Sequence, residues 1–145
     1  MVDMRIKNLF FDRPKVTRAV DKAKRQALSR AGAFIRTTAR SSIRKRKTSA
    51  PPGRPPHSHT GLLKRFIFFG YDPATDSVVV GPVGFKRSNA PNVLEFGGTT
   101  VVERRTKGTK RRRRVRIGAR PFMGPALEKE RPKFPVLWRN SVRGG

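Results

Sequence analysis

The sequence of 145 residues contains no cysteine, which excludes a disulfide scaffold and any thiolate metal site. Acids are also scarce, because nine Asp and Glu stand against 35 Lys and Arg. No apolar run approaches the length of a membrane span, and the N-terminus lacks the apolar stretch of a signal peptide. We therefore expect a soluble protein that is made in a reducing compartment and does not contact a membrane.

The formal net charge of +26 predicts an anionic partner. Such a surface repels itself unless phosphate, acidic protein or anionic lipid lies against it. Hydrophobic residues make up only 35% of the chain, but ten Phe are unlike a disordered tail. The length suits one folded domain, and we expect a single domain over residues 1–145.

The clearest element is a long amphipathic helix predicted over residues 12–43. Asp12 is a suitable N-cap, and Pro14 lies in the first turn, where its missing N–H does no harm. An apolar stripe recurs at steps of three and four residues: Val16, Val20, Ala23, Ala27, Ala31, Phe34 and Thr38. Gly32 lowers the helix propensity of this segment, but one Gly does not break so regular a helix.

Residues 44–61 are predicted as a Pro-rich loop, and residues 62–98 as a region of strands. Leu62 to Tyr71 is apolar on both faces, which predicts a buried central strand that contains Phe68. A second strand over residues 77–83 follows after a turn.

Residues 99–117 are predicted as a long basic β-hairpin with its tip at Lys107 and Gly108. One acid, Glu103, stands among its basic residues, and none of the latter could join a core. We therefore expect the hairpin to project and to contact a partner or DNA through Arg104, Arg105, Lys107, Lys110, Arg111, Arg112, Arg113, Arg114 and Arg116.

A helical part is predicted over residues 119–143, interrupted near Pro132. The expected fold is α+β, with the long N-terminal helix packed on a roughly four-stranded antiparallel sheet, an extended basic β-hairpin and a short C-terminal helix. We expect the helix stripe, the Phe-rich strand and Trp138 to share one core.

The sequence predicts no enzyme, no cofactor and no metal site. His57 and His59 lie in a Pro-rich loop without further ligands, so a role in shaping a turn explains them better than a metal. Asp72 and Asp76 lie in a turn and are expected to bind their own backbone. Glu95 is the most interesting acid, but a Glu paired with Arg is more often structural than catalytic. No phosphate-binding loop or nucleophile motif occurs, and a nuclease would lack its acidic or His cluster.

Five sequence motifs occur in an order that resembles a known family. They are Ala-Gly-Ala-Phe-Ile-Arg-Thr-Thr-Ala-Arg (31–40) followed by Ser-Ile-Arg (42–44), Pro-Pro-His-Ser-His-Thr-Gly-Leu-Leu-Lys (55–64), Val-Val-Val-Gly-Pro (78–82), Val-Leu-Glu-Phe-Gly-Gly (93–98) and Ala-Arg-Pro-Phe-Met-Gly-Pro-Ala-Leu (119–127). Together they resemble the small neck or tail-completion proteins of siphovirus-type tailed bacteriophages, typified by the HK97 tail-component family.

The resemblance implies a virion structural protein of the head–tail junction, made in the cytoplasm of the host bacterium. It implies a hexameric or dodecameric ring in contact with other neck, connector and tail proteins. It leaves open whether the hairpin binds a neighbouring subunit, the connector or packaged DNA. It also marks positions that are signatures of the fold and not of an active site: Thr60, Gly61, Leu62, Glu95, Phe96, Gly97, Arg120, Pro121 and Phe122.

An alternative is a basic nucleic-acid-binding module that contacts the phosphate backbone without sequence specificity. Composition favours this alternative, whereas the order of the motifs favours the virion protein. A role at a membrane surface is disfavoured, because the apolar face of the long helix lacks clusters of Trp or Leu.

Overall fold

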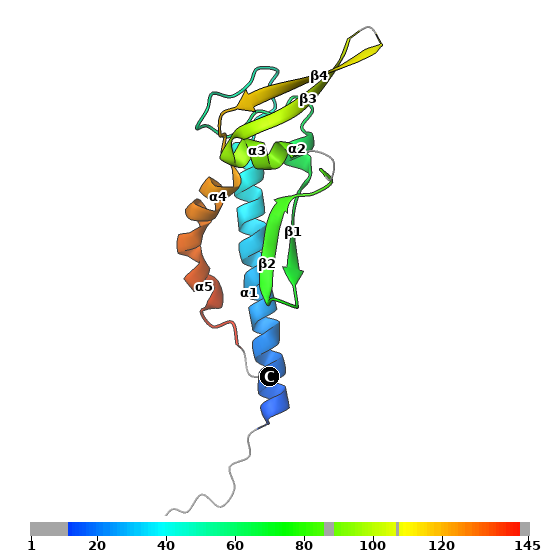
Figure 1. Ribbon diagram of the computed structural model, residues 1–145. Helices are drawn as coiled ribbons and strands as arrows, with labels where there is room; N and C mark the ends of the chain where they lie inside the picture. Colours follow the sequence, from blue (N-terminus) through cyan, green and yellow to red (C-terminus); the bar gives the residue numbers. More distant parts are fainter. Residues whose placement is uncertain (1–11, 86–88, 107, 143–145) are drawn as a thin grey trace, which may run out of the picture.

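The computed structural model describes residues 12–85, 89–106 and 108–142, which form an elongated α+β fold around one long helix. The C-terminal arm and the first pair of strands flank this helix, and the remaining elements lie at its C-terminal end (Figure 1). In chain order the elements are α1 (Arg13–Ser42), α2 (Leu62–Arg65), β1 (Ile67–Asp72), β2 (Ser77–Pro82), α3 (Ala90–Phe96), β3 (Gly98–Thr106), β4 (Thr109–Ile117), α4 (Met123–Glu130), the 3₁₀ turn η1 (Arg131–Lys133) and α5 (Phe134–Trp138).

Helix α1 confirms the long N-terminal helix that the periodicity predicts. The Asp12 side chain accepts a hydrogen bond from the backbone N–H of Lys15 at 3.0 Å, and Pro14 lies in the first turn. Thirty residues give a length of about 45 Å. Its buried stripe consists almost entirely of small residues, which lets other elements approach its axis closely: Ala23, Ala27, Ala31, Gly32, Ile35 and Ala39.

The prediction of one four-stranded sheet is wrong, because the strands form two separate antiparallel pairs. The β1–β2 pair packs along α1, where a Cβ on Gly32 would lie 2.6 Å from Val78 Cγ2 and 3.0 Å from Phe69 Cδ2. Gly32 therefore sits where the sheet crosses the helix, and any side chain there would push the sheet away.

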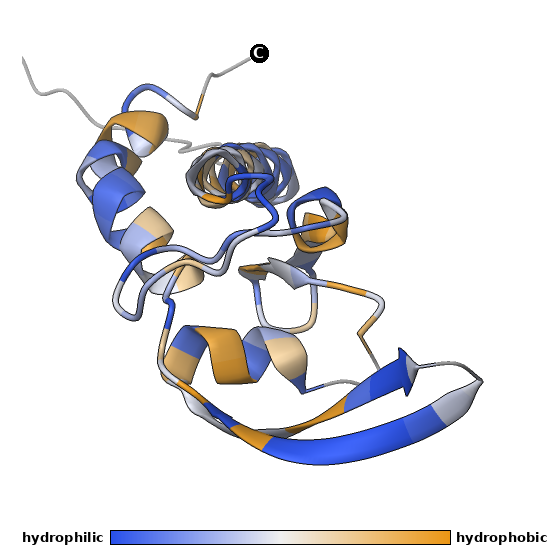
Figure 2. Ribbon diagram, turned by 90° about the horizontal axis from the view of Figure 1, so that it is seen from above, coloured by the Kyte–Doolittle hydropathy of each residue, from blue (hydrophilic) through white to orange (hydrophobic). Residues whose placement is uncertain are grey.

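Strands β3 and β4 form the second pair, which we call the β3–β4 ribbon. It pairs Gly98 with Ile117 at its base and Thr106 with Thr109 near its tip. Seen along α1, the ribbon is curved and runs out past α3, and much of its length is hydrophilic (Figure 2). Lys107, at the predicted tip, lies outside the described residues.

The predicted buried strand over residues 62–71 is wrong at its start and in its burial. Its first four residues form α2, and β1 begins only at Ile67. Ile67 is fully buried, but Phe68 is 45% exposed, because the two-stranded sheet packs one face on α1 and Phe68 lies on the other face. There, among the cations of the described residues, the Arg36 guanidinium alone lies over Phe68, 5.7 Å from the centroid of its ring. The apolar residues Val93 to Phe96 likewise lie in a helix, α3, and not in a strand.

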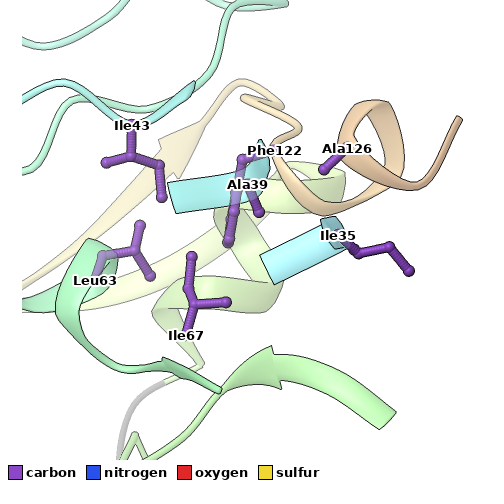
Figure 3. Close-up of a cluster of buried hydrophobic side chains, with 7 residues drawn as sticks. All are labelled: Ile35, Ala39, Ile43, Leu63, Ile67, Phe122 and Ala126. Atoms are coloured by element: carbon purple, nitrogen blue, oxygen red, sulfur yellow. The ribbon is translucent and has the colours of Figure 1, made fainter. Parts of the chain in front are cut away.

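The buried core lies where the C-terminal end of α1 meets α2, β1 and α4 (Figure 3). Trp138 is 44% exposed and takes no part in it, so the expectation of a core shared with Trp138 and Phe68 is wrong. The core therefore occupies one end of the elongated molecule, and its buried members are Ile35, Ala39, Ile43, Leu63, Ile67, Phe122 and Ala126.

Candidate functional site

Glu95 joins the end of α3 to the start of α4. Its Oε2 accepts hydrogen bonds from the backbone N–H groups of Phe122 at 2.8 Å and Met123 at 3.0 Å, and its Oε1 accepts one from Gly124 at 2.7 Å. A carboxylate at a helix N-terminus satisfies N–H groups that have no partner within the helix and also faces the positive end of its dipole. Glu95 is therefore structural, although its partners are backbone N–H groups and not an Arg side chain.

Several of the predicted signature residues meet at this junction. The backbone N–H of Arg120 donates to the carbonyl of Leu94 at 2.6 Å, and its guanidinium Nε donates to the carbonyl of Ala50 at 2.6 Å. Gly97 adopts a φ of 77°, and a Cβ there would lie 3.1 Å from the backbone nitrogen of Ala119. The two segments 93–98 and 119–127 thus form one hydrogen-bonded joint, with Pro121 leading into the buried Phe122.

The remaining signature residues do not join this cluster. Thr60, Gly61 and Leu62 lie at the start of α2, where Gly61 adopts a φ of 77°. Leu62 is 46% exposed, and Phe96 is 78% exposed. Phe96 is the most exposed large hydrophobic side chain in the part of the chain that the structure describes. It therefore lies on the surface and not in the core.

Phe96 lines an apolar groove of about 800 Å³ that runs between β2, α3 and α4. Val78 and Val80 form its β2 wall, Leu127 its α4 wall, and Ile35 belongs to its lining. The sequence did not reveal this groove, because its walls come from three separate segments. The Pro at the start of α3 and the Gly after it were the only signals that α3 is a helix.

A second apolar surface lies on the open face of the β1–β2 pair. In the register of the two strands, Phe68 and Val79 point to the same face, opposite to that of Ile67. Val79 is 62% exposed, and Phe68 stacks in a tilted arrangement with Phe66 at 6.5 Å between ring centroids. We call these side chains the outer β1–β2 face.

The accessible surface of the chain is large for its mass. It measures 12004 Å², whereas a compact protein of 16.4 kDa exposes about 7500 Å². Counting every residue outside the described ranges as fully extended chain still leaves an excess of about 2000 Å². The described part of the protomer therefore leaves apolar and polar surface open that a compact fold would bury.

The β3–β4 ribbon carries the densest charge of the described residues. Eight of the nine predicted contact residues lie on it, all exposed, and the ninth is Lys107. Arg112 Nε lies 2.6 Å from Glu103 Oε1, and no other ribbon cation has an acidic partner among the described residues. The structure therefore brings Arg104, Arg105, Lys110, Arg111, Arg112, Arg113, Arg114 and Arg116 into one ribbon.

A polar cluster ties the β1–β2 turn to α1. Asp76 accepts hydrogen bonds from Lys24 and from the Tyr71 hydroxyl, and the Arg25 guanidinium lies 5.0 Å from the centroid of the Tyr71 ring. The hydrogen bonds from Lys24 and then Tyr71 lower the pKa of Asp76. Asp72 binds its own turn, where hydrogen bonds from Thr75 and the Ala74 N–H lower its pKa. Both acids are thus structural, but Asp76 binds the side chains of Lys24 and Tyr71, and not its own backbone as expected.

The two histidines lie apart from any ligand set in the described chain. His57 Nδ1 lies 2.9 Å from the carbonyl of Thr48, within the Pro-rich loop. No group of three His, Asp or Glu side chains that could hold a metal ion occurs among the described residues. No helix in the same ranges has the length and hydropathy to cross a membrane.

Comparison of the chain with protein-family models, with curated proteins and with solved structures finds no match. Three features of the chain itself therefore bear on its function: the two apolar surfaces, the basic ribbon and the order of the sequence motifs.

Proposed function

We propose that this chain is a structural protein of the phage head–tail junction, a neck or tail-completion component that assembles into a ring. The observation that carries the proposal is the presence of two different apolar surfaces on one elongated protomer, the groove and the outer β1–β2 face. The order of the five motifs supports the virion setting.

Two different surfaces are what a ring requires. A head-to-tail contact joins one surface of each protomer to another surface of the next, and it closes when the rotation divides a full turn. The groove is concave and exposes Phe96, whereas the outer β1–β2 face presents Phe68 and Val79. We therefore place the outer β1–β2 face of one copy in the groove of the next.

The open area of the protomer fits this arrangement. A standard interface buries about 800 Å² on each partner, and a ring member has two interfaces. The protomer exposes about 2000 Å² more than a compact fold, and the ribbon accounts for a share of it, so the excess leaves room for interfaces of this kind without measuring them. The two surfaces contain none of the ribbon cations, so assembly does not force the ribbons of neighbouring copies together.

The oligomeric mass of the purified chain tests the proposal. After nuclease treatment, light scattering should find one oligomer whose mass does not fall between low and high salt, because apolar contacts are not screened. Electron microscopy should then show rings with an open centre. A monomer that carries nucleic acid and releases it steeply with salt would instead support the alternative, a free-standing nucleic-acid-binding module.

Two single variants test the head-to-tail contact. Phe96→Glu places a charge at the groove and Val79→Glu places one on the outer β1–β2 face, and each alone should yield monomers. Both changes lower the positive charge, so a loss of assembly cannot come from added repulsion between like charges. A mixture of the two variants retains one intact contact and should form dimers that cannot grow.

The matched control is Val142→Glu, because Val142 is 53% exposed and lies outside both surfaces. It should assemble like the unmodified chain. A chain that stays monomeric at every salt concentration, or a mixture of variants that forms no dimer, would contradict the proposed ring.

A further inference from the structure

The β3–β4 ribbon exposes basic side chains on both of its faces. Residues paired across an antiparallel ribbon share a face, and the faces alternate along each strand. Arg105, Lys110, Arg112, Arg114 and Arg116 therefore lie on one face, and Arg104, Arg111 and Arg113 lie on the other. A partner that neutralises this ribbon has to reach both of its sides.

A second copy of this chain cannot supply the missing negative charge. Every acid that the structure describes is already engaged within its own protomer, and Asp3, outside the described residues, is one charge against eight. Three acids bind backbone N–H groups: Asp12 caps α1, Asp72 binds its own turn and Glu95 caps α4. The other five pair with cations: Asp21 and Asp76 with Lys24, Glu103 with Arg112, Glu128 with Arg131, and Glu130 with Lys133, while Glu130 also binds Thr38.

The shape of the ribbon and its Arg content fit duplex DNA. The major groove of B-form DNA is about 12 Å wide and admits a two-stranded β-ribbon. Inside it, each face of the ribbon meets one of the two phosphate rows that border the groove.

Other anionic partners fit less well. Seven of the eight described cations are Arg, whose planar guanidinium binds phosphate through two parallel hydrogen bonds. A flat acidic protein surface would meet one face and leave the cations of the other unneutralised. The major groove of A-form RNA is too deep and narrow to receive the ribbon.

We infer that the β3–β4 ribbon binds double-stranded DNA in the major groove through the phosphates on either side, without reading the base sequence. The ribbon contains no Asn or Gln to pair with adenine. Arg can pair with guanine in the major groove, but the ribbon's Arg side chains lie on its two faces, which meet the phosphate rows and not the base edges on the groove floor. The ribbon lies at the C-terminal end of α1 (Figure 1), and the exposed residues Arg44 and Lys45 follow that end closely in the chain, so they add to the positive field of the ribbon. The inference goes beyond the proposed ring, because the apolar surfaces assemble without DNA.

The binding of the full chain to a fluorescent 24-base-pair duplex, measured by anisotropy over a range of salt concentrations, tests the inference. With about six phosphates contacted, the logarithm of the affinity should fall with the logarithm of the salt concentration at a slope of about −5. Replacement of Arg111, Arg112, Arg113 and Arg114 by Thr should make this slope shallower by about 3.6 and weaken binding about 100-fold or more at low salt.

Two matched variants separate the ribbon from net charge. Four exposed cations on the distant part of α1 (Lys15, Arg18, Lys22 and Arg30) are replaced by Gln, which removes the same charge and should weaken binding less than about tenfold. Replacement of Arg111–Arg114 by Lys keeps the charge and should keep the slope. If the Thr variant does not fold, Arg104→Thr with Arg105→Thr tests the other strand, with an expected slope change of about 1.8.

The same experiment also tests RNA and an acidic polypeptide as competing partners. Duplex RNA of the same sequence should bind at least about tenfold more weakly than the DNA, and polyglutamate at equal charge should fail to displace the duplex. If the ribbon variant and the α1 variant lose the same amount of affinity for the duplex, the ribbon is not the binding surface. RNA that binds as tightly as DNA, or polyglutamate that displaces it, would overturn the DNA assignment in favour of RNA or an acidic protein. The Phe96→Glu monomer should keep the slope, which separates this result from ring assembly.

Discussion

The carboxylate of Glu95 should be the most sensitive polar group in the described fold. It accepts three backbone hydrogen bonds across 27 to 29 residues of sequence, and those bonds fix the start of α4 against the end of α3. Removing the carboxylate leaves the N–H groups of Phe122 and Met123 unpaired in a partly buried setting, whereas Gly124 is near solvent and can bind water.

The expected magnitude follows from those two bonds. A hydrogen bond to a charged group contributes about 1.5–3 kcal/mol, and partial exposure places each bond here near the lower value. Glu95→Ala should therefore lower the free energy of unfolding by about 3 kcal/mol, which corresponds to a Tm lower by about 10 °C for a chain of this length. Glu95→Gln keeps one acceptor oxygen and should cost about half as much.

Thermal and urea unfolding, followed by circular dichroism, measures this difference. The control is Glu128→Ala, because Glu128 is an exposed acid of α4, the helix that Glu95 caps. Among the described residues its carboxylate pairs with Arg131 alone, at 3.7 Å, so its loss should cost less than about 0.5 kcal/mol. If Glu95→Ala and Glu128→Ala unfold within about 0.5 kcal/mol of each other, the capping role assigned to Glu95 is wrong.

Three further substitutions test the packing and the charges. Gly32→Ala should destabilise by about 1 kcal/mol, because overpacking against Val78 outweighs the gain in helix propensity, and a stabilised variant in urea unfolding would contradict the contact. Phe68→Ala should cost about 1–2 kcal/mol in the same assay and Ile67→Ala about 2–5, and the reverse order would contradict the open sheet face. Hydrogen bonds from Lys133 and then Thr38 lower the pKa of buried Glu130. The stability that its ionised carboxylate adds to the fold is therefore fully present at pH values above the ordinary pKa of Glu, and it is lost as the pH falls through the lowered pKa. Glu130→Gln should therefore destabilise at neutral pH, and a pH-independent difference in Tm would contradict this.

The sequence predicted the parts of the fold that depend on local pattern. Thirty residues of regular apolar spacing, with Asp12 and Pro14 at the start, define α1 to within one residue at each end. The turn at Asp72 and the strands around it follow from the same kind of local signal. In each case the residues that decide the conformation are neighbours in the sequence.

The errors arose where the conformation depends on distant residues. Leu62–Arg65 is too short to show helical periodicity, and its conformation is fixed by the packing of Leu63 against Ile43 and Ile67. The apolar run around Phe68 looks the same whether one face or both are covered, and only the number of strands in the sheet decides this. The structural role of Glu95 was expected, but its partners could not be predicted, because they lie 27 to 29 residues away at the start of α4.

The shortage of acids links the stability of the protomer to its partners. Most of the described acids hold elements of the fold together, and of these acids Glu103 alone pairs with a ribbon cation, so repulsion within a chain of +26 opposes the compact state. Any partner that binds only the native state adds stability, about 2.7 kcal/mol at a concentration 100 times its Kd. The groove, the outer β1–β2 face and the ribbon cations share no residue. Self-association and duplex DNA should therefore raise the Tm of the chain by independent amounts, and Phe96→Glu should abolish the first increase and leave the second.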